Sequence, residues 1–266
     1  MKPVALITGA SAGIGAELAR VFAAHGHSVA LVARRGTRLE SLAAEIVAKG
    51  YPPPLVVAAD LERPDGVARV AEALAAHSVE PQYVVNNAGF GLVGPAAELD
   101  RDRQLAMIDL NMRALTDLSL RFVDSLVRQR GGLLNVASVA GVMPGPGSAV
   151  YYASKAFVLS FTEALHRELE PQGVRVTCLC PGPVATEFQA RAGIAEAAPP
   201  WPLAVAASGV AAAGYHGLMR GRRVVAPGLG SKLLMALVPR IVPRGILLKR
   251  LEARQIGRRQ RPGSAV

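Results

Sequence analysis

The sequence predicts an α/β fold in which a doubly wound, parallel sheet carries helices on both faces. Short runs of almost wholly apolar residues alternate with longer helical patterns, and strands of this kind are covered on both sides. The 266 residues are 51% hydrophobic, which is enough for one sizeable core. Such a sheet binds its ligand in a crevice at the carboxyl ends of its strands.

The elements alternate regularly along the chain, and each predicted strand is a short apolar run bounded by turn residues. The predicted strands are residues 4–8, 28–33, 55–58, 83–86, 132–137 and 174–179. The predicted helices begin at Gly13, Thr37 and Pro64, and two longer ones span residues 100–128 and 149–168. No repeat or long linker interrupts this order, so residues 1–228 are predicted to form one domain.

Three features indicate the cellular setting. Cys178 and Cys180 alternate within an apolar strand, so their side chains share a face and are poorly placed to bridge each other; buried thiols in a reducing compartment are expected, with redox chemistry as the alternative. The apolar run at residues 4–7 is too short for a secretory signal. Residues 197–219 are uncharged but interrupted by Pro and Gly, which favours a buried loop and helix over a membrane span. A cytoplasmic location is therefore expected.

The formal net charge of +10 belongs to the end of the chain. Residues 217–266 contain 12 of the 30 Lys and Arg residues and a single acid, Glu252, which gives this segment +11 and the rest of the chain −1. Residues 229–266 form a basic extension with two predicted amphipathic helices, at 231–238 and 244–256. These helices either pack on the body or a partner subunit, or contact an anionic membrane at its inner face. Nucleic-acid binding is disfavoured because no aromatic platform accompanies the arginines.

A glycine-rich turn, TGASAGIG at residues 8–15, directly follows the first strand. Glycines there let the backbone approach a pyrophosphate, and the next helix offers unpaired N–H groups. NAD-preferring sites carry an acid about twenty residues further on, but this chain has Arg34. Arginine pairs well with a 2′-phosphate, so NADP(H) is the predicted cofactor. Arg34 is predicted to bind this phosphate, and Arg35 is interpreted as a solvated residue at the start of a helix.

Tyr151 and Lys155 lie four residues apart at the start of a predicted helix and therefore share a face. A lysine ammonium beside a phenol lowers the pKa of the phenol, which makes the tyrosine a usable acid and base near neutral pH. Such pairs also arise by chance, so the prediction depends on their neighbours. Ser138 follows the fifth strand, where it can hydrogen-bond a carbonyl or cap a turn, and Asn111 lies within the long helix, where it has a catalytic role or bridges backbone groups.

These motifs resemble those of the short-chain dehydrogenase/reductase family, whose members have a Rossmann fold. TGASAGIG matches the family's glycine turn, NNAG at residues 86–89 matches its fourth-strand motif, and Asn111, Ser138, Tyr151 and Lys155 match its catalytic set. The resemblance covers residues 3–190 in the correct order. Ala12 departs from the pattern, because some NADP-preferring relatives have a basic residue there.

The resemblance implies a role for each matched residue. Tyr151 would be the acid in reduction and the base in oxidation, Ser138 would polarise the carbonyl, and Asn111 would order a water in the proton relay. Asp60 and Leu61 would hold the adenine, and Thr186, which could instead begin a helix, would anchor the carboxamide. The implied cofactor-binding set is Gly9, Ser11, Gly13, Ile14, Gly15, Arg34, Asp60, Leu61, Asn87, Gly89, Lys155, Pro181, Gly182, Val184 and Thr186. No metal site is predicted.

An apolar substrate is predicted from residues 183–202, which fall where this family places a cover over the substrate. Phe188 and Trp201 are the large groups of this segment, and residues 142–144 line the same mouth or belong to the core. A ketone, aldehyde or 3-oxoacyl group is therefore expected to exchange a hydride with NADP(H). A rival function is an NADP(H)-binding sensor or membrane-surface scaffold that acts through the basic extension. By resemblance, the long helices pair subunits into a homodimer or homotetramer.

Overall fold

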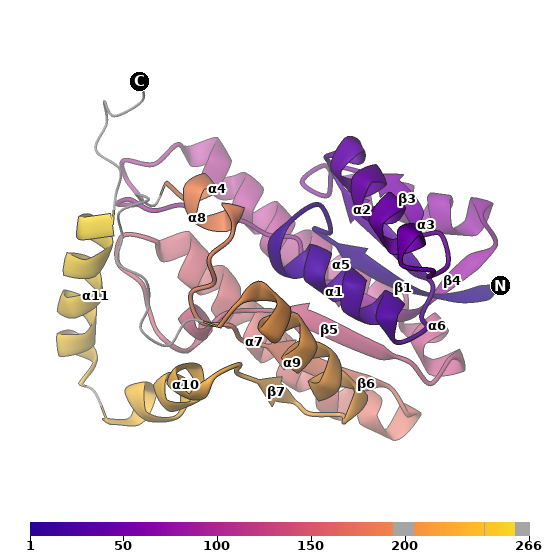
Figure 1. Cartoon of the computed structure of the whole chain (residues 1–266). Helices are drawn as coiled ribbons and strands as arrows, with labels where there is room; N and C mark the ends of the chain where they lie inside the picture. The colour runs from indigo at the N-terminus through magenta and orange to yellow at the C-terminus, as the bar shows by residue number, and fades with distance from the viewer. Residues whose placement is uncertain (194–204, 242, 259–266) are drawn as a thin grey trace.

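A seven-stranded parallel sheet organises the chain in the order β3-β2-β1-β4-β5-β6-β7 (Figure 1). The computed structural model describes residues 1–193, 205–241 and 243–258. The strands are β1 Lys2–Thr8, β2 Val29–Ala33, β3 Leu55–Ala58, β4 Val79–Asn86, β5 Gly132–Val136, β6 Arg175–Leu179 and β7 Val224–Val225. The strand order reverses between β1 and β4, which leaves a crevice at their carboxyl ends. The predicted doubly wound α/β fold is confirmed.

Helices cover both faces of the sheet, and successive side chains of β1 enter two separate cores. Ala5 and Ile7 pack with α1, α2 and α9, whereas Val4 and Leu6 pack with α3, α5, α6 and α7. The helices are α1 Gly13–Ala24, α2 Gly36–Ala48, α3 Gly66–Ala76, α4 Arg101–Ile108, α5 Leu115–Arg121, α6 Val123–Arg128, α7 Ala149–Leu169, α8 Glu187–Arg191, α9 Ala207–Met219, α10 Leu229–Ile241 and α11 Arg244–Arg258, with short 3₁₀ turns at Val139–Val142 and Glu170–Gln172. The helix expected within residues 197–219 is α9, and residues 194–204 lie outside the described residues.

The single long helix predicted over residues 100–128 is wrong. The chain forms α4, a π-helical segment at Asp109–Ala114, then α5 and α6, with a break at Phe122. The wider π turn carries Asn111, whose amide hydrogen-bonds the backbone of Phe90 in the loop after β4. Because this contact is tertiary, the local helical pattern gives no sign of it.

Two strands differ from the prediction. β4 begins four residues before the predicted start, at Val79, although it contains Pro81. Pro81 pairs with Val4 next to a register shift, where a missing backbone donor is tolerated. β7 was not predicted, since it has only two residues and pairs with the edge of β6. Cys178 and Cys180 are free and buried, as predicted, with their sulfurs 3.6 Å apart.

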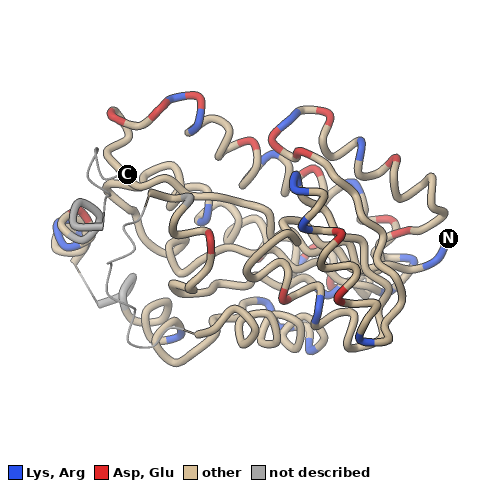
Figure 2. Tube along the Cα trace, turned by 45° about the horizontal axis from the view of Figure 1, so that its top comes forward, with Lys and Arg blue, Asp and Glu red and all other residues tan. Residues whose placement is uncertain are grey.

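The basic extension forms α10 and α11. α10 buries Ser231 against Gly182 of the loop after β6 and exposes Leu229, Leu233 and Leu237. α11 stands at one end of the molecule, and Figure 2 shows lysine and arginine along it. Among the described residues, no helix combines the length and the apolarity that a membrane crossing requires.

The packing of α1 against α9 makes stability depend on pH through His27. Its Nε2 lies 3.1 Å from the Tyr215 hydroxyl, and burial, aided by the nearby His25 and Arg175 cations, lowers the pKa of His27 below its usual range. The unfolded chain therefore binds more protons as pH falls below about 6.5, and stability is lost there. We expect His27→Gln to reduce the fall in Tm between pH 7.5 and 5.5, whereas replacing the exposed His77 with Gln leaves it unchanged; an equal fall in both variants contradicts the assignment.

Candidate active site

A pocket of about 600 Å³ opens at the carboxyl ends of the strands, where the strand order reverses. Nearly all of the predicted site residues line it, although they come from distant parts of the sequence. Gly15 and Asn111 do not line it, because both lie behind the wall. Of residues 142–144, Met143 reaches the pocket, and Trp201 lies outside the described residues.

The glycine turn needs its glycines for two different reasons. Gly9 and Gly13 have φ of +67° and +56°, a backbone region that other residues rarely adopt. A Cβ on Gly15 would lie 2.3 Å from the Gly9 carbonyl oxygen, so the first turn of α1 packs directly on the loop. This close approach leaves the N-terminal N–H groups of α1 facing the pocket, which is the arrangement that binds a phosphate group.

The loop after β4 is joined to the glycine turn by hydrogen bonds. The Asn87 amide donates to the Thr8 carbonyl at 3.0 Å, and the Thr8 hydroxyl accepts from the backbone of Asn87 and Ala88. Asn87 therefore fixes the distance between the two loops. Gly89 is required in the same loop because a Cβ there would lie 2.8 Å from the Asn111 side-chain oxygen.

Arg34 and Arg35 line the pocket just after β2, and each has a carboxylate partner. Arg34 pairs with Glu62 at 2.8 Å, near Asp60, whose carboxylate accepts from the Glu62 N–H. Arg35 donates to the Ser11 hydroxyl at 3.0 and 3.3 Å and pairs with Glu187 at 2.8 Å. The interpretation of Arg35 as a solvated helix start is therefore wrong, since its guanidinium lies on the glycine turn.

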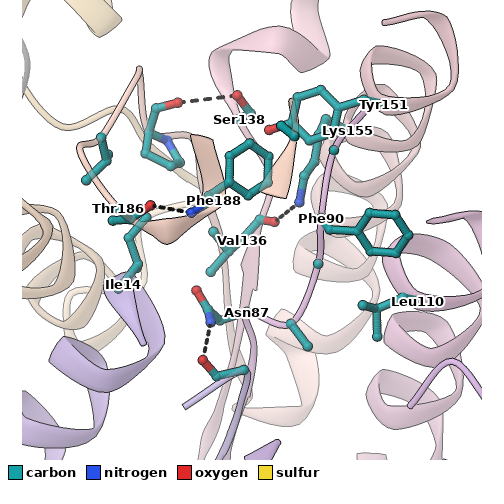
Figure 3. A pocket seen from close by; sticks show the side chains of 18 of the residues that line it. Ile14, Asn87, Phe90, Leu110, Val136, Ser138, Tyr151, Lys155, Thr186 and Phe188 are labelled. Carbon is teal, nitrogen blue, oxygen red and sulfur yellow. Dashed lines mark hydrogen bonds between the residues drawn. The ribbon is translucent and has the colours of Figure 1, made fainter. Parts of the chain in front are cut away.

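Tyr151 and Lys155 lie on the first turns of α7 and share a face, as the spacing predicts. Figure 3 shows the Tyr151 hydroxyl pointing toward Ser138. Lys155 is 5% exposed, its Nζ donates to the Val136 carbonyl at 2.9 Å, and it lies 5.9 Å from the centre of the Tyr151 ring. Burial of the ammonium lowers the pKa of Lys155 to about 8.

Ser138, Thr186 and Asn111 each make the structural contact that the sequence offered as the alternative to a catalytic or binding role. Ser138 accepts from the Ala140 N–H and caps the following turn, and Thr186 accepts from the Phe188 N–H at the start of α8. Asn111 accepts from the Phe90 N–H at 3.1 Å and donates to the Phe90 carbonyl at 3.0 Å. The backbone thus fixes Ser138 and Thr186 at the edge of the pocket and Asn111 behind its wall, and such fixation is compatible with a catalytic or binding role.

The end of the pocket beyond Tyr151 is apolar. Phe188 lies across it, with its ring 5.6 Å from that of Tyr151, and a Cβ on Gly91 would meet the far edge of the Phe188 ring at 2.9 Å. Leu234 of α10 and Leu251 of α11 complete this part of the wall. The other lining residues here are Leu92, Val93, Met143, Ser148, Tyr152, Gln189 and Ala192, and none is charged.

Most of the sequence matches one protein family. The model of the short chain dehydrogenase family matches residues 3–197. The chain belongs to this family. It is therefore an oxidoreductase of a family that uses a nicotinamide cofactor, and the resemblance drawn from its motifs is confirmed.

Relatives of this short-chain dehydrogenase differ in how much of the chain they match. Sulfoacetaldehyde reductase from Chromohalobacter salexigens is 39% identical over 191 residues, which is 71% of this chain and 75% of the relative. A solved short-chain dehydrogenase from Sphingobium yanoikuyae in complex with NADPH is 31% identical, covers 100% of this chain and 99% of its own, and has a TM-score of 0.78. The bulky-bulky ketone specific alcohol dehydrogenase from Comamonas testosteroni is 27% identical, covers 99% and 97%, and has a TM-score of 0.74.

Proposed function

We propose that this short-chain dehydrogenase is an NADP(H)-dependent oxidoreductase that transfers a hydride between the nicotinamide ring and an apolar ketone, aldehyde or secondary alcohol. The observation that carries this proposal is that one pocket joins three kinds of group. These are the pair Arg34 and Arg35, the glycine turn, and Tyr151 with the buried Lys155 beside an uncharged wall. When bound, the cofactor supplies the hydride, and the protein supplies position and protons.

The residues present fit NADP(H) at both ends of the cofactor. The glycine turn and the N-terminus of α1 suit the pyrophosphate, since a Cβ at Gly9 or Gly15 would fill the space that the backbone needs. Arg34 and Arg35 supply planar donors for a 2′-phosphate. Asp60 and Leu61 would hold the adenine, and Lys155, Val184 and Thr186 would hold the nicotinamide half.

Proton transfer would centre on Tyr151. Its hydroxyl would donate a proton to the carbonyl oxygen in reduction and take the proton back in oxidation. The Lys155 ammonium would stabilise the phenolate that remains, because a buried positive charge interacts strongly with a nearby negative one. Ser138 would hold the carbonyl oxygen toward Tyr151, and Asn111 would order a water that carries the proton onward.

A bulky apolar substrate is favoured by the uncharged wall and by the extension that completes it. Leu234 and Leu251 belong to α10 and α11, and the ketone-specific relative covers this part of the chain as well. The sulfoacetaldehyde reductase match extends over 191 residues only. A sulfonate would also need a cation, and the arginines that line the pocket, Arg34, Arg35 and Arg103, each already face a carboxylate.

Subunit association and location extend the proposal. Leu105 and Ile108 of α4 and Leu120 of α5 expose 50%, 38% and 52% of their surface, which supports pairing of these helices in a homodimer or homotetramer. We also propose a cytoplasmic location. Contact of the basic extension with the inner membrane face stays a prediction.

Cofactor titration and a paired substrate assay test this function. NADPH is expected to bind at least tenfold more tightly than NADH in a fluorescence titration, because charge-assisted hydrogen bonds to the phosphate each contribute about 1.5–3 kcal/mol. With NADPH, a ketone flanked by two bulky apolar groups is expected to be reduced faster than sulfoacetaldehyde. Equal binding of the two cofactors refutes the NADP(H) assignment, and faster reduction of sulfoacetaldehyde refutes the apolar substrate.

A further inference from the structure

Three consecutive residues at the start of α8 contact three different parts of the pocket. Thr186 packs over the glycine turn, where a Cβ on Gly13 would lie 3.1 Å from its methyl group. Glu187 pairs with Arg35 at the adenosine end, and Phe188 lies against Tyr151 at the other end (Figure 3). α8 therefore connects the site predicted for the phosphate to the site predicted for proton transfer.

The Glu187–Arg35 pair occupies the donors that a 2′-phosphate requires. Arg35 uses Nε and Nη2 for Ser11, and its Nη1 donates to the Glu187 carboxylate at 2.8 Å. A phosphate on this guanidinium would bring a second anion beside Glu187, and two anions at one guanidinium repel each other. The phosphate carries the larger negative charge and three acceptor oxygens, so it has the advantage in this competition.

We propose that Glu187 competes with the 2′-phosphate of the cofactor for Arg35, so that NADPH, and not NADH, releases the start of α8 from the glycine turn. This inference rests on the proposed function and adds a specificity-determining residue to it. The carboxylate lowers the affinity for NADPH, and its release couples recognition of the phosphate to the segment that covers Tyr151.

Release of the start of α8 would affect catalysis because it frees Phe188 to move. Its ring lies beside Gly91, 5.6 Å from the Tyr151 ring, so movement of this ring changes the space that a carbonyl compound has next to the phenol. The Glu187–Arg35 pair restrains the preceding residue of the same helix. NADH has no phosphate to break the pair, so in the NADH complex the ring stays over Tyr151 for a larger fraction of the time, and turnover is slower.

The second arginine provides a matched comparison. Arg34 makes a pair of the same 2.8 Å length with Glu62, which precedes α3; the Glu62 carboxylate is less exposed than that of Glu187 and also lies 3.6 Å from Arg103. If Arg34 were the main phosphate reader, Glu62→Gln would raise the NADPH affinity more than Glu187→Gln. If a carboxylate acted only by repelling the phosphate, removal of Glu62 or of Glu187 would raise the NADPH affinity, and neither effect would require Arg35.

The test is a double-mutant cycle on the full chain with Glu187→Gln, Arg35→Gln and the double variant. Kd for NADPH and NADH is measured by fluorescence, and kcat is measured with each cofactor and the bulky ketone. Glu187→Gln is expected to bind NADPH about threefold to fivefold more tightly, as for the loss of one exposed ion pair, with NADH binding unchanged and the NADH-supported kcat raised by a similar factor. In the Arg35→Gln background, both effects disappear.

Two results overturn the inference while leaving the proposed function intact: an equal gain for both cofactors, or a gain in NADPH affinity that persists without Arg35. A larger gain in Glu62→Gln transfers the phosphate to Arg34 and also overturns it. Failure of the proposed function is separate, since the unmodified chain would then bind NADH as tightly as NADPH.

Discussion

Replacement of Tyr151 with phenylalanine is expected to lower kcat about a thousandfold and to leave the Kd for NADPH within about twofold. The hydroxyl is the proposed proton donor in reduction, and phenylalanine has no proton to donate in its place. The ring keeps its contacts with Phe188, so the pocket wall stays intact. Steady-state rates with the bulky ketone and fluorescence titration with NADPH, both on the full chain, measure the two quantities.

Tyr152→Phe is the matched control, because it removes the same hydroxyl one residue away. The Tyr152 ring packs on Gly145, where a Cβ would approach it to 2.2 Å, and position 156, four residues on, is an alanine. A loss below about tenfold is expected. If Tyr151→Phe retained full biological activity, the chain would instead be the NADP(H)-binding sensor or membrane-surface scaffold that its basic extension also suggests.

Elements whose signal is local were predictable from the sequence. β1, β2, β3, β5 and β6 were predicted to within two residues at either end, because a strand buried on both faces is a continuous apolar run bounded by turn residues. The glycine turn and the spacing of Tyr151 and Lys155 were predictable for the same reason, since backbone freedom and helical periodicity act within a few residues.

Features that depend on distant contacts were not predictable in this way. The π-helical turn around Asn111 is fixed by the Phe90 backbone, and the two-residue β7 exists because β6 offers an edge. The contact of Arg35, and not Arg34, with Ser11 was not predictable either, because sequence order carries no such information. One available sign was Glu187, an acid directly after Thr186 in the mostly apolar cover segment and close to the predicted phosphate site.

The wall beyond Tyr151 was missed for a related reason. Leu234 and Leu251 belong to an extension that was expected either to pack on the body or a partner subunit or to contact a membrane, because amphipathic helices rich in lysine and arginine suit each of these. Their approach to the pocket depends on the contact of Ser231 with Gly182. A glycine three residues after the end of the sixth strand is consistent with close packing, but it does not identify the helix that packs there.

Loss of the Lys155 ammonium is expected to affect both catalysis and the pH dependence of stability. Lys155→Met is expected to lower kcat about a thousandfold, because the phenolate of Tyr151 loses its stabilising charge. In the unmodified enzyme, kcat/KM for NADPH reports the free protein, so it is expected to fall about tenfold per pH unit above pH 8, where Lys155 loses its proton. The exposed Lys49→Met variant should retain both the rate and this profile.

The free energy of unfolding gives an independent measurement of the Lys155 pKa, because the folded-state pKa of Lys155, about 8, lies below its usual value of 10.5. Between these two values the unfolded chain binds more protons than the folded chain, so the Lys155 contribution to the free energy of unfolding rises with pH across this window and is constant below it. Denaturant titrations at pH 7.5 and 9.5 should show this rise in the unmodified protein and its loss in Lys155→Met. The same slope in both proteins would mean that the Lys155 ammonium keeps its ordinary pKa of 10.5 in the folded protein, as a solvated group does, and the role assigned to its burial beside Tyr151 would then fail.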